Sequence, residues 1–309
     1  MLECAAWRSG VLRLTDASRF FSAGPVNALR FARLAARTAF ALDPETVRAA
    51  RAAADGPAAP PRILREELTA LLTGRDPASG LQFCRTCGLL AKILPEVDAL
   101  YGVEQPPRFH PEGDVWTHTM LLLKHLFAPD AVLAWSALLH DIGKPAAQSR
   151  GADGRIRFFN HESIGAEMAD RLCGRLAFPA EDRTRIVRAV AGHMRFCNTR
   201  AMRPATVEKL LETSDFPLAL ELMRLDCMAC HGLLDDYLFL LDAWAEKIAR
   251  PARPAPFLRG EDLLALGLKP SPRFGAILRQ IYDRQLSGEL ADRAAALAAV
   301  KQGLGSGTI

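Results

Sequence analysis

The sequence predicts an all-α fold, and three observations support this prediction. Apolar residues recur at helical spacing along nearly the whole chain, whereas stretches that alternate apolar and polar residues are almost absent. Half of the 309 residues are hydrophobic and 24% are charged, which suits a water-soluble chain with a large core. Breaks rich in Pro and Gly at 55–62, 151–155 and 250–256 separate the helical stretches.

The helical spacing is clearest in five segments, and we expect a helix over each of them. They are 27–40, 63–72, 115–127, 184–194 and 217–230. The only strand pair that we expect is a short hairpin in GADGRIRFF, because Asp153-Gly154 is a favourable turn pair.

The breaks suggest a chain of three parts. Residues 1–100 form an Arg-rich helical region, residues 101–250 carry nearly all the histidines, and residues 251–309 form a small helical region. The metal site described below is expected in the helical bundle of the middle part.

Composition limits the cellular setting and the partners of the chain. The net charge of +4 permits a polyanionic partner without requiring one. The N-terminal stretch MLECAAWRSGVLRL has early charges and no apolar core, so we do not expect a signal peptide. No uncharged apolar stretch reaches the roughly 18 residues that a membrane span needs. We therefore expect a cytoplasmic protein with no membrane partner.

The seven cysteines favour reduced thiols, since their number is odd and no secretion signal is expected. Two C-x-x-C pairs occur, Cys84/Cys87 and Cys227/Cys230. Both lie in apolar helical patterns, where cysteine behaves as a small hydrophobe. A zinc site built from both pairs is the alternative, and it requires a long intervening segment to fold back.

Histidines are concentrated in the middle part, where six of the seven fall between 110 and 193. His118 lies within DVWTHTMLLL. His140-Asp141 closes the apolar helix AVLAWSALL, which Gly143 and Pro145 then end. The remaining polar residues of interest are His161 at the start of NHESIGAEM, His193 at the end of RIVRAVAGHM and Asp226 inside ELMRLDCMAC.

These residues are the types that bind divalent metal ions. A carboxylate in an apolar helix is costly unless a partner compensates it, and neutral imidazoles and carboxylates are common ligands. Five segments that each offer one or two such groups predict a metal site inside a helix bundle. For His110, His125 and His231 we expect satisfied core histidines, with a place near the mouth of the site as the alternative for His110.

The series H…HD…D, with HDIGK at its centre, resembles the HD metal-dependent phosphohydrolase superfamily, and HESIGA and AGHM match its multi-histidine branch. From about residue 7 to about residue 302 the chain also resembles bacterial CCA-adding tRNA nucleotidyltransferases and related poly(A) polymerases, in the region that follows their catalytic head. The matching stretches include NALRFARLAARTAFALDPETV, HPEGDVWTHTMLLL, ALLHDIGKPA and LRGEDLLALGLKPSPRFG.

Two departures from that family concern nucleotide addition. No Gly-Ser motif with a following Arg-Asp, and no D-x-D pair, precedes the neck-like region, although nucleotidyl transfer needs such carboxylates to hold magnesium. The family's base-selecting E-D-x-x-R triad is replaced by Ala23-Gly24-Pro25-Val26-Asn27. We therefore expect no nucleotide addition by this chain alone.

The resemblance implies how the polar residues are used. His118, His140, Asp141 and Asp226 would hold a first divalent ion, Asp141 would bridge toward a second, and His161 and His193 would complete the second position. Such sites accept Mn, Fe, Ni, Co or Mg, so we expect one or two divalent ions of unspecified identity.

Two further residues have both a functional and a simpler interpretation. Lys144 follows the HD pair by three residues and could neutralise a phosphate oxygen, which together with Asp141 makes it a candidate catalytic residue; a solvated lysine is the alternative. Glu162 could support a metal ligand or simply be an acid in the first turn of a helix.

Arg30, Arg33 and Arg37 recur at i, i+3 and i+7 and so share one helix face. By the resemblance to tRNA enzymes this face could contact an RNA backbone; a solvated face or salt bridges within the bundle is the alternative. The aromatic content of 7% gives no evident platform for stacking bases.

The leading functional hypothesis is an HD-type metal-dependent phosphohydrolase acting on a phosphomonoester or a cyclic phosphodiester. By resemblance, a nucleotide or an RNA 3′ end is the substrate class, with tRNA or another RNA as partner. The alternative is an accessory RNA-binding protein, or a fragment of a tRNA nucleotidyltransferase whose polymerase head is encoded separately.

Overall fold

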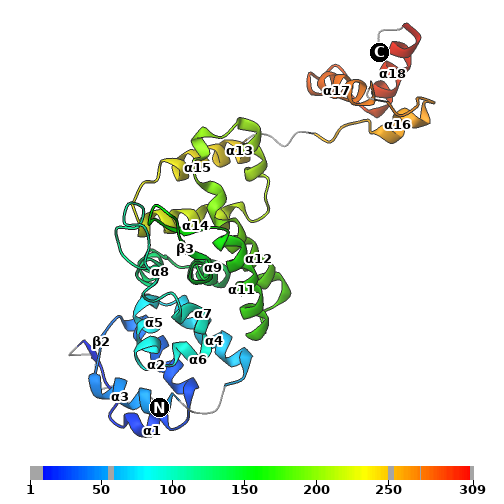
Figure 1. Cartoon of the computed structure of the whole chain (residues 1–309). Coiled ribbons are helices and arrows are strands. Elements are labelled where there is room, and N and C mark those ends of the chain that lie inside the picture. The colour runs from blue at the N-terminus through cyan, green and yellow to red at the C-terminus, as the bar shows by residue number, and fades with distance from the viewer. Residues whose placement is uncertain (1–9, 55–58, 250–253, 272, 307–309) are drawn as a thin grey trace. The chain divides into compact units, whose positions relative to one another are not determined.

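The computed structural model describes residues 10–54, 59–249, 254–271 and 273–306, and helices dominate this part of the chain (Figure 1). The all-α prediction is therefore confirmed. The chain forms two compact units, one that ends at Lys247 and one that begins at Ile248. The predicted boundary near residue 100 lies inside the first unit and stays a prediction.

Two of the N-terminal helices of the first unit, α3 (Pro44–Ala53) and α5 (Pro77–Thr86), begin with an aspartate cap followed by proline. Asp43 and Asp76 each accept a hydrogen bond from a backbone N–H in the first turn of the helix that follows, and proline occupies the next position. The helices are α1 (Ala17–Phe21), α2 (Pro25–Thr38), α3 (Pro44–Ala53), α4 (Pro61–Leu72), α5 (Pro77–Thr86), α6 (Leu90–Ile93) and α7 (Pro95–Asp98).

The helices that carry the predicted metal ligands follow. Asp114 and Asp130 cap α8 and α9 in the same way as the earlier aspartates. These elements are α8 (Val115–Lys124), α9 (Ala131–Leu139), α10 (Lys144–Ala147), α11 (His161–Arg175), α12 (Ala180–Gly192), the 3-10 helices η1 (His193–Phe196) and η2 (Thr199–Ala201), α13 (Pro204–Leu211), α14 (Phe216–Ala229) and α15 (Asp235–Ala249).

Two predicted helices end earlier than the apolar spacing suggests. The segment 27–40 leaves the helix after Thr38, because Ala39 takes a left-handed conformation with φ of 54°. The segment 115–127 is helical only to Lys124. His193, predicted at the end of a helix, is the first residue of η1.

Strands are short in the described residues. The expected hairpin is present as β3 (Gln148–Arg150) paired antiparallel with β4 (Ile156–Phe158). Gly154 lies in the intervening turn with φ of 73°, a conformation that glycine adopts at no steric cost. A second pair was not predicted: β1 (Val11–Leu12) runs parallel to β2 (Ala41–Leu42).

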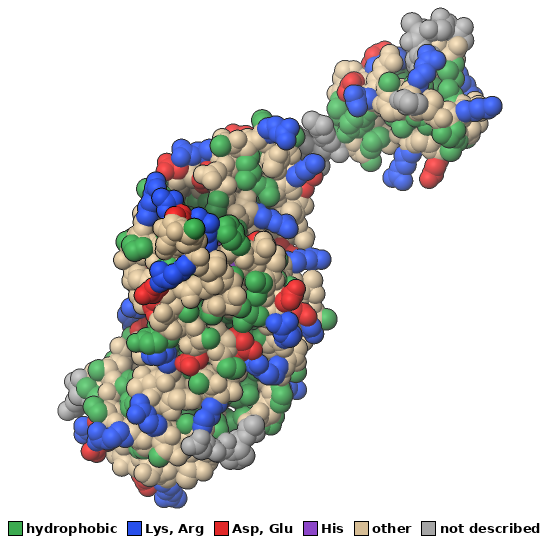
Figure 2. Space-filling model, viewed as in Figure 1, with side chains coloured by type: hydrophobic (Ala, Val, Ile, Leu, Met, Phe, Trp, Pro, Cys, Tyr) green, Lys and Arg blue, Asp and Glu red, His purple; other side chains and the backbone are tan. Residues whose placement is uncertain are grey.

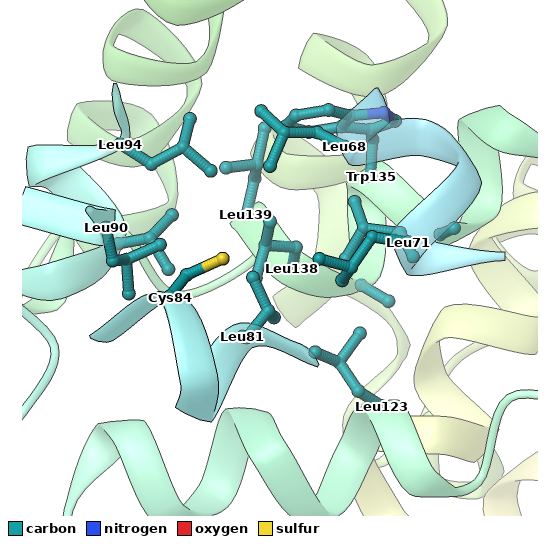
Figure 3. Packing of buried hydrophobic residues seen from close by; sticks show 14 of the residues in the cluster. Leu68, Leu71, Leu81, Cys84, Leu90, Leu94, Leu123, Trp135, Leu138 and Leu139 are labelled. Carbon is teal, nitrogen blue, oxygen red and sulfur yellow. The ribbon is translucent and has the colours of Figure 1, made fainter. Parts of the chain in front are cut away.

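One hydrophobic core runs through most of the first unit. Leucines of α4, α5, α6, α8 and α9 converge on it (Figure 3), together with Trp135 and the thiol of Cys84. The Trp135 indole Nε1 donates to Thr69 Oγ1 at 2.9 Å, which ties α9 to α4. Cys84 and Cys87 are buried free thiols, as expected for small hydrophobes, whereas Cys227 and Cys230 are half-buried.

The second unit has its own apolar core, which includes Leu263, Ile281 and Val300. Its helices are α16 (Gly260–Ala265), α17 (Arg273–Leu286) and α18 (Arg293–Ser306). On the face shown in Figure 2, Lys and Arg side chains are interspersed with Asp and Glu on both units. Among the described residues, no helix has both the length and the apolar character that a bilayer crossing requires.

Candidate metal centre

The structure brings together all six side chains that the sequence predicted as metal ligands. They come from the middle of α8 (His118), the turn after α9 (His140 and Asp141), the start of α11 (His161), the start of η1 (His193) and the second half of α14 (Asp226). The four histidines and Asp141 are buried, and the side chain of Asp226 is 32% exposed.

The first ligand group contains His118, His140 and Asp226 and faces one oxygen of Asp141. The Nε2 atoms of His118 and His140 are 3.3 Å apart, and Asp226 Oδ1 is 3.0 Å from His118 Nε2. Asp141 Oδ2 lies 3.1 Å from His140 Nε2 and 3.9 Å from His118 Nε2.

The second ligand group contains His161 and His193 and faces the other oxygen of Asp141. Their Nε2 atoms are 3.1 Å apart. Asp141 Oδ1 lies 3.4 Å from His161 Nε2 and 3.7 Å from His193 Nε2. Asp141 therefore stands between the two groups and offers one carboxylate oxygen to each.

These spacings fit the coordination of divalent ions. Nitrogen and oxygen ligands about 2.1 Å from a common ion are themselves about 3.0–3.4 Å apart in octahedral or tetrahedral geometry. Neutral imidazoles and carboxylates are also the donor set that such ions accept. The donor set and the spacings of the cluster thus suit a divalent ion, while the number and identity of the ions stay predictions.

Hydrogen bonds behind the histidines fix which ring nitrogen faces the cluster. Each Nδ1 atom contacts an acceptor, so it must carry the proton, and Nε2 is left as the ligand atom. Backbone carbonyls accept from three rings, at 2.9 Å for His140 with Ala137, 2.9 Å for His161 with Phe158 and 2.7 Å for His193 with Val190.

The fourth ring is backed by a residue that the sequence analysis missed. His118 Nδ1 lies 2.7 Å from Glu112 Oε1, and the same oxygen lies 2.9 Å from His110 Nδ1. Glu112 precedes His118 by six residues in the loop HPEGD, where an acid raises no expectation of a partner in a helix. Because His118 turns its protonated nitrogen toward Glu112, this trio supports the first ligand group and is not a third metal position.

Gly143 lets α11 approach the turn after α9, which holds His140 and Asp141 and is called the HD turn below. This approach brings His161 of the second ligand group next to Asp141. A Cβ atom at Gly143 would lie 2.6 Å from the backbone nitrogen of Gly165 and even closer to the carbonyl oxygen of His161. Only glycine fits between these two backbones. The glycine in HDIGK therefore positions His161, beyond its predicted role in ending the helix.

The first ligand group is strongly polarised. Burial disfavours the charged form of His118, yet the carboxylates of Asp226 and Glu112 raise its pKa to about 9. Burial also opposes the charge of Asp226, but the hydrogen bond with His118 holds the pKa of Asp226 below its ordinary value. In the protein without bound metal, a proton thus occupies His118 between two carboxylates.

The second ligand group has less negative charge around it. Burial lowers the pKa of His193 to about 4 against the attraction of Asp141, so this ring is neutral. Burial also disfavours the charge of His161, but its contact with Asp141 raises its pKa. Asp141 itself is buried, and His140 and Lys144 hold its pKa well below the ordinary value.

Lys144 is buried beside the cluster, so the alternative of a solvated lysine is wrong. Its Nζ lies 2.7 Å from Asp141 Oδ2 and donates to Gln105 Oε1 at 2.6 Å. The nearby carboxylate compensates the cost of burying the ammonium group. Glu162 lies in the first turn of α11 with its Oε2 3.5 Å from His161 Nδ1, so both interpretations describe its position.

A cleft of about 460 Å³ opens onto the cluster and is lined by four of the six ligands, namely Asp141, His161, His193 and Asp226. Lys144, His110 and His231 also border it. His231 is exposed, so the expectation of a core histidine is wrong for it. His110 is half-buried and borders the cleft, in agreement with the alternative given for it. His125 is half-buried at the end of α8, and its role in the core stays a prediction.

The arginine face of α2 is partly occupied by the protein itself. Arg30 Nε and Arg33 Nη1 lie 3.1 and 2.9 Å from the two carboxylate oxygens of Glu67 on α4. Arg37 is exposed. Arg30 and Arg33 thus form the salt bridges given as one alternative, and RNA contact by the three arginines stays a prediction.

Asn27, at the position where the sequence predicts a replaced base-selecting triad, forms local hydrogen bonds. The Asn27 amide donates through Nδ2 to the carbonyl oxygen of Phe20 at 2.8 Å and accepts from Arg30 Nη1 at 3.3 Å. Both the nitrogen and the oxygen of this amide therefore have hydrogen-bond partners within residues 1–100, the neck-like region.

Two family patterns match this chain. The HD domain matches residues 114–228, and the region described as the probable RNA and SrmB-binding site of polymerase A matches residues 39–101. The first match contains the six predicted ligands, and the second contains Glu67 and α3 to α7.

The chain is 34% identical over 303 residues to the A-adding tRNA nucleotidyltransferase of Deinococcus radiodurans. This alignment covers 91% of the chain and 68% of the relative. It is 37% identical over 227 residues to the multifunctional CCA protein of Halorhodospira halophila, covering 70% of this chain and 53% of the relative. The chain thus spans about half the length of the multifunctional CCA protein.

A solved structure supports the fold. The CCA-adding enzyme of Bacillus stearothermophilus, solved in complex with CTP, aligns with a TM-score of 0.53 at 15% identity. The alignment covers 97% of this chain and 68% of that enzyme. At this identity the likeness concerns the fold alone.

Proposed function

The chain belongs to the tRNA nucleotidyltransferase family, whose HD domain and RNA-binding region it carries, and from this premise we propose that it is an HD-type metal-dependent phosphohydrolase. The proposed substrate is a phosphomonoester or 2′,3′-cyclic phosphodiester of a nucleotide or an RNA 3′ end.

The observation that carries this proposal is the position of Asp141 between two ligand groups. Its two oxygens lie 3.1 Å from His140 Nε2 and 3.4 Å from His161 Nε2. A carboxylate shared in this way is typical of sites that bind two ions for phosphate-ester hydrolysis. An isolated structural histidine would not need a second histidine group on the other oxygen of the same aspartate.

A divalent ion, when bound, supplies Lewis-acid polarisation of the phosphoryl group and activation of water. The side chains prepare this chemistry in two ways. The Nδ1 hydrogen bonds hold four imidazoles with their Nε2 atoms toward one centre. Lys144 places a positive charge at the cleft floor, where it can contact a phosphate oxygen at the cost of its contact with Gln105.

The region that precedes the HD domain in the chain supports the proposed substrate class. The probable RNA-binding region of polymerase A matches residues 39–101, directly before the HD match, and one relative is named as a tRNA nucleotidyltransferase. The cleft beside the cluster is open to solvent and large enough for a terminal nucleotide. We therefore propose RNA, tRNA in particular, as the source of the phosphate ester.

A screen of the metal-loaded protein tests the proposal. We expect hydrolysis of 2′,3′-cyclic nucleotides, nucleoside monophosphates or tRNA with a terminal phosphate, and loss of that activity on chelation. Mn, Co, Ni, Fe and Mg are compared at equal concentration. Hydrolysis that persists after chelation, or no hydrolysis of any of these substrates with any metal, contradicts the proposal.

Nucleotide addition by this chain alone is not part of the proposed function. The Asn27 amide, at the replaced E-D-x-x-R position, is occupied by Phe20 and Arg30. We expect no incorporation of radiolabelled CTP or ATP into tRNA that lacks its 3′ end. Incorporation by the purified chain with no second protein present would refute this expectation.

A second candidate function is supported by the RNA-binding match. The chain would then bind RNA in partnership with a nucleotidyltransferase head supplied by another polypeptide or another segment of sequence. Co-purification with a protein that carries the Gly-Ser and D-x-D motifs, and restoration of nucleotide addition on mixing, would support this function. Neither result excludes hydrolysis by the HD cluster.

A further inference from the structure

The cleft over the metal cluster has apolar walls above its charged floor. The buried side chains of Asp141, Lys144, His161 and His193 form the floor. Ile156 and Phe158 of β4 contribute apolar surface on one wall, and Phe109 and Met194 also border the cleft. A phosphate group needs none of this apolar surface, so the walls are suited to another part of the substrate.

Two phenylalanines line the cleft, Phe109 and Phe158, and Phe109 is the more exposed of the two, with an exposed fraction of 59%. Its backbone is nevertheless fixed. The backbone nitrogens of Phe109 and His110 both donate to the carbonyl oxygen of Pro106 at 3.0 Å. His110 is held in turn by Glu112, the carboxylate that supports His118.

Met194 is the second exposed apolar side chain at the cleft, at 45%. It directly follows the predicted ligand His193 in η1. Phe109 thus directly precedes His110, which Glu112 holds behind the cluster, and Met194 directly follows His193 within the cluster. Their backbones keep a fixed position relative to the floor, while their side chains are left to solvent.

A cation lies beside Phe109. The guanidinium of Arg108 lies 5.6 Å from the centre of the Phe109 ring. Arg157 also borders the cleft, where its Nη2 lies 2.9 Å from Asp153 Oδ2. An exposed aromatic ring beside cations is the combination that binds a nucleotide, because the base stacks on the ring and the cations attract phosphate. A sugar phosphate without a base would use the charges and leave the ring unused.

We propose that Phe109 is a specificity-determining residue that stacks on the base of the nucleotide whose phosphate lies at Asp141 and Lys144, with Met194 adding apolar contact. This inference rests on the proposed function and narrows it: the substrates are phosphate esters that carry a nucleobase, and esters of bare sugars are poor substrates.

The kinetic test compares a nucleoside monophosphate with ribose 5-phosphate, using wild type and Phe109→Ala. We expect the substitution to lower kcat/KM for the nucleotide about tenfold, mainly through KM, since base stacking typically contributes that much to binding. The value for ribose 5-phosphate should change less than twofold. Phe109→Trp keeps an aromatic ring at this position, so its kcat/KM for the nucleotide should equal or exceed that of wild type.

The matched control is Phe127→Ala. Phe127 is 90% exposed in the same unit and does not border the cleft, so its removal should leave both substrates unchanged. Equal losses for the nucleotide and ribose 5-phosphate in Phe109→Ala would overturn the proposal, as would a wild type that does not prefer the nucleotide. Metal content is measured for each variant, and a drop in Phe109→Ala would also overturn it.

A binding measurement separates this inference from the hydrolase proposal. The Phe109→Trp variant places an indole at the cleft, and its fluorescence is compared with that of wild type during titration with nucleoside monophosphate or ribose 5-phosphate. Quenching by the nucleotide only supports the base-stacking role even if no substrate is hydrolysed, in which case the hydrolase proposal alone fails. Quenching by neither ligand overturns the role of Phe109.

Discussion

The two ligand groups that meet at Asp141 differ in charge and in support. His118 of the first group contacts the Asp226 and Glu112 carboxylates in addition to lying near Asp141. In the second group, His161 and His193 both contact Asp141 Oδ1, and among the described residues they share no other carboxylate. Backbone carbonyls accept hydrogen bonds from both rings. The groups are equally compact but unequally charged.

This difference predicts two positions of unequal affinity. A divalent cation gains more from two carboxylates with Glu112 2.7 Å behind His118 than from one carboxylate oxygen with Glu162 3.5 Å behind His161. The first group should bind an ion tightly, and the second should fill at higher metal concentration. The predictions below test this inequality, beginning with the residue that both groups share.

Replacing Asp141 by Ala should have the largest effect, because it removes the only side chain common to both groups. We expect metal content to fall at both positions and hydrolysis to drop by roughly a thousandfold or more. Metal analysis and turnover are measured on the same preparation, with circular dichroism to check that the helices are retained. Wild-type activity in this variant would show that the cluster is not the active site.

Replacing His161 or His193 by Ala should remove the weaker ion only. We expect metal content under saturating conditions to fall from two ions toward one, and turnover to slow by about a hundredfold, with a small change in folding stability. His140→Ala is the matched control, since it should weaken the tighter position instead. A single ion in wild type and in all three variants would mean that the second histidines contact substrate phosphate.

Glu112→Gln should weaken the first position without touching the second. Glutamine keeps the shape and an acceptor oxygen for His118 Nδ1 but removes the negative charge behind the ring. Loss of such a partner typically lowers metal affinity by about 10- to 100-fold. Titration with a competing chelator resolves the two affinities. A weakening of both positions to the same degree would contradict the assignment of Glu112 to the first group.

The mildest test changes the pH and leaves every side chain in place. The pKa of His118 is about 9, above its ordinary value, so the stabilising charge of this ring is fully present below pH about 6.5 and is lost as pH rises to about 9. Metal binding at the first group must displace this proton. Its affinity should therefore rise with pH up to about 9, by at most tenfold per pH unit, and then level off. An affinity that does not change between pH 7 and 9 would contradict this protonation state.

Much of this arrangement could be predicted from the sequence, because the relevant information is local. Helical spacing indicated the all-α fold, and five segments with His or Asp in apolar surroundings predicted the six residues that converge. Glu112 could not be predicted in the same way. It acts across a loop, and nothing in HPEGD indicates that its carboxylate reaches back to His118.

The neck-like arginines show the opposite limit. Their spacing correctly placed Arg30 and Arg33 on one face of α2, but spacing does not say what lies opposite that face. Glu67, from a helix 37 residues further along, occupies both guanidinium groups. His231 was misassigned for the same reason, since its exposure depends on the turn after α14 and on the cleft beyond it.

The close contact between Gly143 and Gly165 has a consequence for engineering this protein. Two backbones, rather than two side chains, set the distance between the HD turn and α11, so an added methyl group would act as a wedge between the two ligand groups. Mutant libraries aimed at a new substrate should therefore leave Gly143 untouched and vary the rim of the cleft. The chemistry and the selectivity of the enzyme can then be redesigned separately.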